Sequence, residues 1–107
     1  MAWAVTETFE GSWEDYRRIA EEIGERDIPD GLYFHVAGPC EDGIRTMSVW
    51  DSEESHDAFV EQRAAPAAQR VLGKERSAGL TSHAAIDVEH FVMAHAMTPA
   101  SHQIAFY

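Results

Sequence analysis

The chain has 107 residues, which is enough for one domain with its own hydrophobic core. It is 45% hydrophobic and 25% charged, as ordinary globular proteins are, and its formal net charge is −11. Because the acidic residues are spread along the chain, its surface repels phosphate groups. We therefore expect no nucleic-acid partner and no docking on an anionic membrane.

Cysteine content and hydropathy indicate a cellular location. Cys40 is the single cysteine, so an intramolecular disulfide is excluded, as is usual in a reducing compartment. No apolar run in the sequence approaches the length of a membrane span, and the N-terminus lacks the pattern of a secretory signal. We expect a cytoplasmic protein with no membrane partner.

The N-terminal quarter predicts a strand followed by a helix. Residues 2–9 alternate apolar and polar side chains, with Glu7 as an acid on the same side as Trp3 and Val5. Ser12 is a suitable N-cap for the helix that follows. The apolar side chains of this helix recur at helical spacing and form one stripe: Trp13, Tyr16, Ile19, Ala20 and Ile23.

The next segment predicts a β-hairpin. Residues 32–37 and 44–50 are rich in the apolar and aromatic side chains that suit a half-buried strand. Between them, residues 38–43 are typical of a turn, and Asp42-Gly43 is the sharpest hairpin signal.

A second helix is expected from about Ser52. The predicted buried side chains are those of Ala58, Phe59 and Val60. Pro66 should interrupt the helix, because proline lacks a backbone N–H and clashes with the preceding turn. A shorter helix over residues 67–72 is expected after the kink.

The last third predicts a loop, a strand and a tail. Residues 73–82 are polar, and residues 84–95 alternate as a fourth strand. We therefore assign residues 1–95 to the domain and residues 96–107 to a C-terminal tail.

The expected order of elements is strand, helix, strand, strand, helix, strand. This order is typical of the ferredoxin-like α+β fold, a βαββαβ antiparallel sheet with helices on one face. The other face would expose a large apolar patch, and such patches are interfaces. We expect a homodimer in which two sheets meet face to face.

The segment GLYFHVAGPCEDGIRTMSVWDSEESHDAFVEQRAAPA resembles the central portion of small actinobacterial proteins of the dimeric α+β-barrel, antibiotic-biosynthesis-monooxygenase-like superfamily. The resemblance implies that fold and a substrate cavity between sheet and helices. It leaves the chemistry open, since the superfamily includes cofactor-independent monooxygenases, polyketide cyclases, haem-degrading enzymes and members without an assigned activity. The haem-degrading pattern is not met: the chain has no asparagine, and Phe59 and Gln69 stand where that pattern has tryptophan and histidine.

His35 is the candidate catalytic residue, because histidine is often found at this position in the resembling family. An imidazole that titrates near neutrality can take a proton from a phenol or an activated carbon acid. Tyr33, predicted to share its face, and Arg45, which could orient a phenolate oxygen, are candidate helpers. The alternative interpretations are a hydrogen-bonded core histidine and an arginine paired with a neighbouring acid.

A flat aromatic pocket for substrate is the second expectation. Its candidate walls are aromatic side chains that could equally be hydrophobic core: Trp50, Tyr16, Trp13, Phe34 and Phe59.

No metal or cofactor is expected. His90 and His95 would point to opposite faces of a strand, and no histidine pair has the spacing of a zinc site. His56 is predicted to face solvent or to cap its helix, and Cys40 lies among acids that disfavour a thiolate. Nothing resembles a nucleotide-binding motif.

The sequence therefore predicts a cofactor-independent monooxygenase or cyclase acting on a small aromatic or polyketide-like substrate. Two alternatives stay open: a non-catalytic ligand-binding or stress-associated dimer, and a protein that binds haem through a histidine.

Overall fold

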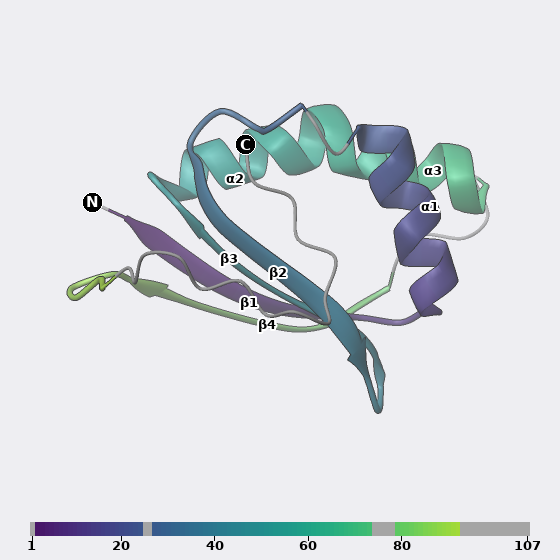
Figure 1. Ribbon diagram of the computed structural model, residues 1–107, viewed down its shortest axis with the longest axis horizontal. Coiled ribbons are helices and arrows are strands. Elements are labelled where there is room, and N and C mark those ends of the chain that lie inside the picture. Colours follow the sequence, from purple (N-terminus) through teal and green to yellow (C-terminus); the bar gives the residue numbers. More distant parts are fainter. Residues whose placement is uncertain (1, 25–26, 74–78, 93–107) are drawn as a thin grey trace, which may run out of the picture.

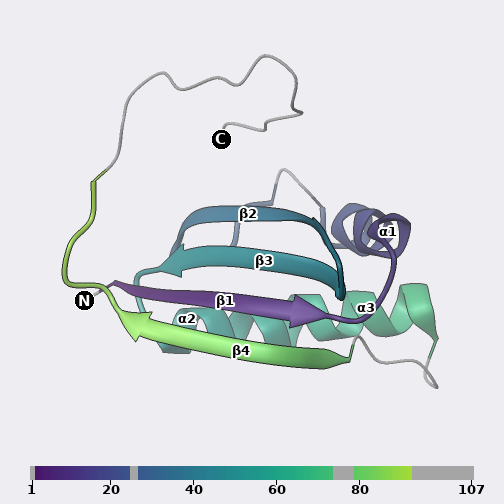
Figure 2. The ribbon, with the colours of Figure 1, turned by 90° about the horizontal axis from the view of Figure 1, so that it is seen from below.

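The computed structural model describes residues 2–24, 27–73 and 79–92 and places helices over one face of a four-stranded sheet (Figure 1). The four strands lie in the order β2-β3-β1-β4, and each neighbouring pair is antiparallel. This is the ferredoxin-like α+β fold that the sequence predicts; Figure 2 views the sheet with α2 and α3 behind it. The elements in chain order are β1 (Trp3–Phe9), α1 (Trp13–Ile23), β2 (Leu32–Cys40), β3 (Gly43–Trp50), α2 (Glu53–Phe59), η1 (Val60–Ala64), α3 (Ala65–Leu72) and β4 (Leu80–Asp87).

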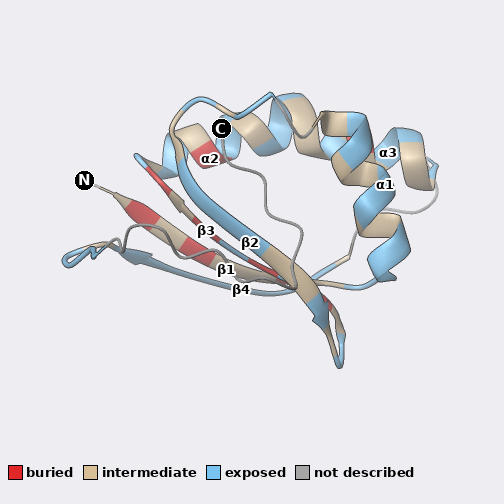
Figure 3. Cartoon of the chain, viewed as in Figure 1, coloured by how far each residue is buried: buried red, intermediate tan, exposed pale blue. Residues whose placement is uncertain are grey.

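The core lies between the two central strands and the helices. Trp3, Val5 and Trp50 form a buried cluster, and Leu32 and Phe59 pack against it. Side chains alternate between the faces of a strand, so the buried apolar side chains of Trp3, Val5, Ile44 and Trp50 define the helix-covered face. Figure 3 shows the buried residues on these two strands and on α2.

Helix α1 begins after Ser12, as the sequence predicts, and extends to Ile23, the last residue of the predicted apolar stripe. The Ser12 side chain accepts a hydrogen bond from the backbone N–H of Asp15, and Gly24 ends the helix with a positive φ. A 2.6 Å hydrogen bond from Arg70 Nε to Glu22 links α1 to α3.

The β2–β3 hairpin is longer than predicted. Strand β2 continues to Cys40, which pairs with Gly43, so that the turn contains only Glu41 and Asp42. Pro39 is tolerated within β2 because this strand is at the edge of the sheet, where a missing N–H costs no ladder bond.

The predicted break at Pro66 is absent. The chain stays helical through α2, η1 and α3, and the N–H of Ala65 bonds to the carbonyl of Val60, five residues earlier. This wider turn lies directly before Pro66, near the start of α3, where a missing N–H is tolerated. Among the residues described, no helix is both long and apolar enough to cross a bilayer.

The side chains that this helical segment buries also differ from the prediction. Ala58 and Val60 are exposed and Phe59 is half-buried, whereas His56 and Ala67 are buried. His56 is therefore not solvent-facing, which corrects the expectation from the sequence.

Strand β4 begins four residues earlier than predicted and ends at Asp87. Its length follows from its partner β1, since Leu80 pairs with Phe9 and Asp87 pairs with Trp3. Residues 88–92 form no strand, and the predicted boundary between residues 95 and 96 lies outside the described residues.

The second face of the sheet is apolar and uncovered by helices (Figure 1). The large side chains on it are exposed by 41–65%: Phe34, Val36, Met47 and Ile86. Phe34, Met47 and Ile86 line a shallow hollow of about 370 Å³, to which Ala4, Thr6 and Val49 also contribute.

Candidate functional site

A histidine–tyrosine pair joins the sheet to α1. The Tyr16 hydroxyl and His35 Nε2 are 2.8 Å apart, within hydrogen-bonding distance. His35 lies on the helix-covered face, because it and Val5 flank Ser48 in the same row of the sheet. Tyr16 belongs to the apolar stripe of α1, and this stripe places its hydroxyl over β2. When Nε2 carries no hydrogen, the tyrosine donates to it.

The surroundings of His35 favour its neutral form. His35 is an exposed residue by its solvent-accessible area, but the protein packed around the ring still desolvates the imidazolium. This desolvation lowers the pKa of His35 from its ordinary value of 6.5, and the negative charge of Glu7 opposes the effect only in part. A neutral imidazole at pH 7 is able to accept a proton.

An exposed aromatic surface extends the pair toward solvent. The Trp13 and Tyr16 rings stack with centroids 5.0 Å apart and an interplanar angle of 14°. Trp13 is 37% exposed. A flat aromatic ligand could stack on this surface with its polar groups near His35.

Of the other two predicted catalytic residues, Arg45 lies apart from this pair. Arg45 is on the opposite face of the sheet, where its Nε donates to Thr8 Oγ1 over 3.3 Å. Tyr33 is 57% exposed and lies at an irregularity in the β2–β3 register. The tyrosine that contacts His35 is Tyr16.

The remaining predicted pocket residues divide between the core and the open face. Trp50 is 2% exposed, donates from Nε1 to Ser48 Oγ over 2.9 Å and packs on Phe59 with ring centroids 5.5 Å apart. Phe34 lies on the uncovered face of the sheet. The structure thus brings together Trp13, Tyr16 and His35, and it separates them from Phe34.

A second polar cluster, formed by Glu7, His56 and Asp57, was not predicted. His56 Nε2 lies 3.2 Å from Glu7 Oε1, and His56 Nδ1 lies 3.1 Å from Asp57 Oδ1. Burial lowers the pKa of His56, but hydrogen bonds to the two carboxylates and their charges outweigh it, so the net pKa is raised above 6.5. The sequence held one signal for this cluster, the acid of Glu7 on the apolar side of the first strand.

The structure has a further hollow of about 250 Å³ beside the segment between α1 and β2. Its walls include Phe59, Ile28 and the ion-paired side chains of Asp27 and Arg63, which are 3.3 Å apart. His35 lines neither this hollow nor the one on the open face. Within the described ranges, no three histidine, cysteine or acidic side chains gather where they could hold a metal ion.

Comparison of the sequence with known protein families finds no match, and comparison with curated proteins finds none either. Solved structures do match the fold. A candidate antibiotic biosynthesis monooxygenase from Chloroflexus aurantiacus is 21% identical with a TM-score of 0.60, over 90% of this chain and 98% of the other.

Two further structures extend the comparison. SnoaB, a cofactor-independent oxygenase from Streptomyces nogalater, is 12% identical with a TM-score of 0.52, over 85% of this chain and 94% of the other. A dimeric ferredoxin-like protein of unknown function from Thermobifida fusca is 13% identical with a TM-score of 0.50, over 80% of this chain and 88% of the other. The chain therefore has the ferredoxin-like fold of antibiotic-biosynthesis-monooxygenase-like proteins, and at these identities the likeness extends to the fold alone.

Proposed function

We propose that this protein is a cofactor-independent monooxygenase or cyclase for a small aromatic or polyketide-like substrate. The observation that carries the proposal is the 2.8 Å contact between Tyr16 and a histidine whose neutral form is favoured. The fold shared with SnoaB is consistent with it. Tyr33 stays a candidate helper. Arg45 has no role in this mechanism, because it lies on the opposite face of the sheet from His35. A cytoplasmic location is part of the same proposal.

His35 is the proton acceptor in this mechanism. The substrate stacks on Trp13 and Tyr16, and an acidic C–H or phenolic O–H gives its proton to the pair. The proton enters at the Tyr16 oxygen while the tyrosine passes its own proton to His35 Nε2. The product of this step is a resonance-stabilised carbanion or phenolate.

Oxygenation and cyclisation diverge after that step. In oxygenation, the carbanion reduces O₂ and forms a carbon–oxygen bond, giving a hydroperoxide that loses water, so CH₂ and O₂ become C=O and H₂O. The substrate supplies all the electrons, and no nucleotide, flavin or metal is needed. In cyclisation, the same carbanion attacks a carbonyl group of its own chain, and no O₂ is consumed.

The test combines native mass spectrometry with an oxygen electrode. The protein is purified from its own host to identify any bound aromatic compound. Small phenols with an acidic CH₂ are then assayed for O₂ uptake and ring closure. His35→Gln should reduce turnover at least about 100-fold, the usual contribution of a general base. The matched control is His90→Gln, which removes an exposed histidine. Wild-type turnover in His35→Gln would overturn the proposal.

A non-catalytic ligand-binding function is the second candidate. It is favoured by the position of His35, which lines neither of the two hollows described. This function predicts a bound small molecule in the purified protein, no turnover of it, and unchanged retention in His35→Gln. Haem binding is checked in the same preparation by the Soret absorbance.

We further infer that the protein is a homodimer in which the open faces of two sheets pack together. The support is the patch of Phe34, Val36, Met47 and Ile86 on that face. The dimeric ferredoxin-like protein from Thermobifida fusca is consistent with such an assembly.

A further inference from the structure

The imidazole of His56 lies between two carboxylates. Its side chain is 9% exposed, that of Glu7 is 13% exposed, and that of Asp57 is 67% exposed. Each ring nitrogen faces a carboxylate oxygen at 3.1–3.2 Å. A neutral imidazole has one N–H and could donate to only one of these acceptors, whereas the imidazolium donates to both. The geometry therefore selects the charged ring.

Two tryptophans hold this ring in place. The centroid of Trp3 lies 5.0 Å from that of His56, and the Trp50 ring meets it edge-on at 5.5 Å. These two ring contacts restrict the orientation of the imidazole, so that its nitrogens stay directed at the two carboxylates. His56 is consequently held between the sheet and the helices in an environment that favours its protonated form.

Glu7 connects His56 to the candidate site. His35 lies in the row His35–Ser48–Val5, and Glu7 is two residues further along β1 on the same face. The charge of Glu7 raises the pKa of His35, against the larger lowering by burial. One carboxylate thus acts on both histidines, and its effect on His35 depends on how far His56 neutralises it.

We propose that His56 is a positioning residue for the chemistry of His35: by pairing with Glu7 it keeps His35 in the neutral, proton-accepting form. This inference rests on the proposed function, in which His35 is the base. His56 is too buried to meet a substrate and acts through Glu7.

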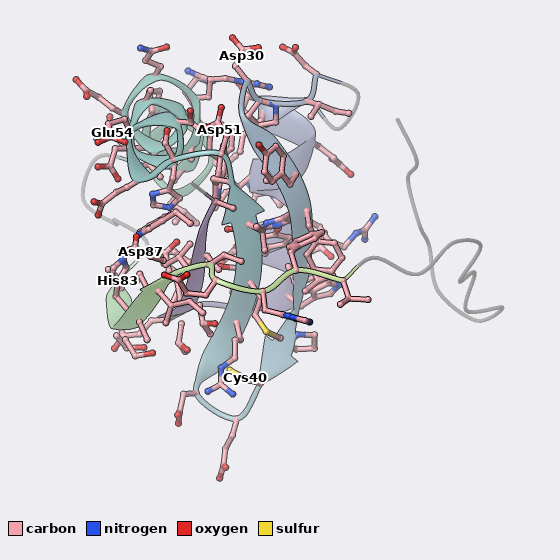
Figure 4. The ribbon with its side chains drawn as sticks, turned by 90° about the vertical axis from the view of Figure 1, so that its left-hand side faces the viewer. Asp30, Cys40, Asp51, Glu54, His83 and Asp87 are labelled. Atoms are coloured by element: carbon pink, nitrogen blue, oxygen red, sulfur yellow. The ribbon has the colours of Figure 1, made fainter. Side chains whose placement is uncertain are left out.

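Other charged and titratable groups surround the cluster. On β4, His83 is the cross-strand partner of Glu7, and Asp87 is the partner of Trp3. Figure 4 shows both on the β4 side of the sheet, whereas Glu54 lies in the helix layer. Tyr16 faces His35 from α1. Because His83 adjoins Glu7, it is unsuitable as a control, and the exposed His90 takes that place.

The test is a ¹H–¹³C NMR titration of the histidine rings, which needs no substrate. In His56→Gln, the His35 midpoint should rise by about 0.5 to 1 unit, because Glu7 is no longer neutralised. In Glu7→Gln the His35 midpoint should fall. The double variant Glu7→Gln/His56→Gln should have the same His35 midpoint as Glu7→Gln alone. His90→Gln should leave His35 unchanged. A His35 midpoint that does not move in His56→Gln, or that moves equally in the Glu7→Gln background, overturns the inference.

Asp57→Asn provides a second variant in case His56→Gln fails to fold. Asp57 is exposed, and its loss should lower the His56 midpoint while leaving the core intact. The His35 ring signals should then show a small second inflection at the new His56 midpoint. If that inflection is absent, the coupling of His56 to His35 through Glu7 is contradicted.

Turnover measurements separate this inference from the proposed function. The titrations can show that His56 is coupled to His35 while His35→Gln retains full activity. In that case the proposed function fails, and the coupling between the two histidines stands. If His35→Gln is inactive, the acid limb of the kcat profile in His56→Gln should move to higher pH together with the His35 midpoint. A limb that stays in place overturns the positioning role.

Discussion

The two histidines under the helix layer make opposite contributions to the pH dependence of stability. The pKa of His56 is raised in the folded state, so its stabilising effect is complete below its ordinary value of 6.5 and is lost as the pH rises through the raised value. The pKa of His35 is lowered, so the folded state resists its protonation and loses stability as the pH falls below 6.5.

We expect His56→Gln to flatten the alkaline side of the stability profile. At pH 6 it should also cost about 2 to 3 kcal/mol of unfolding free energy, because a largely buried Glu7 loses its charged partner. His35→Gln should flatten the acidic side instead. Urea unfolding between pH 5 and pH 9 measures both profiles. An alkaline side unchanged in His56→Gln would contradict this assignment.

Tyr16 can be tested by removing one oxygen atom. Tyr16→Phe deletes the hydrogen bond to His35 and should cost about 1 kcal/mol of stability, the usual net value of such a bond. Turnover should fall about 10- to 100-fold if the hydroxyl relays the proton. Tyr33→Phe removes the hydroxyl of the tyrosine that the sequence predicts as the helper of His35. Steady-state assays of both variants decide between the tyrosines, and a larger loss in Tyr33→Phe would refute the relay.

The sequence identified both members of the pair and missed their contact. His35 was predicted as the base and Tyr16 as a pocket wall, since their proximity depends on where α1 crosses β2. The Glu7–His56 contact was missed for a similar reason. It joins the first strand to the second helix, 49 positions apart, and no local pattern encodes that contact.

At the scale of secondary-structure elements, the hairpin turn depends on Gly43. Its φ is +137°, and a Cβ there would collide with the backbone carbonyl oxygen of Phe9 on β1. Gly43→Ala should therefore cost about 2 kcal/mol or more, because neither strand can move without breaking the ladder. Gly38→Ala is the matched control, since its Cβ would meet no atom within 4 Å. Urea unfolding compares the two, and equal losses would contradict this explanation.

The order of the elements was predictable, but several of their ends were not. The alternation of residues 2–9 and the cap at Ser12 are local signals, and both predictions are confirmed. Strand β4 is different, because it extends only as far as β1 offers a partner, from Phe9 back to Trp3. The helical continuity at Pro66 also escaped prediction, since the wider turn that accommodates it has no simple sequence signature.

At the scale of the whole molecule, the two faces of the sheet differ in what covers them. Helices cover the face that carries His35 and leave the other face uncovered (Figure 1). The large apolar side chains described on that second face are exposed. A surface with Phe34, Met47 and Ile86 each about half exposed or more is costly in water and is stabilised when a second copy covers it.

Met47→Lys should therefore dissociate the proposed dimer. Met47 is 49% exposed on the open face, and a lysine charge buried there between two sheets would lose its hydration. We expect the dissociation constant to rise at least about 100-fold, which corresponds to about 3 kcal/mol. Val60→Lys is the matched control: it also places a lysine at an exposed apolar residue, but in the helix layer. Sedimentation velocity at several concentrations distinguishes the outcomes. A monomeric wild-type protein would refute the dimer, and a dimer disrupted by Val60→Lys but not by Met47→Lys would place the interface in the helix layer. In either case the open face would need another partner.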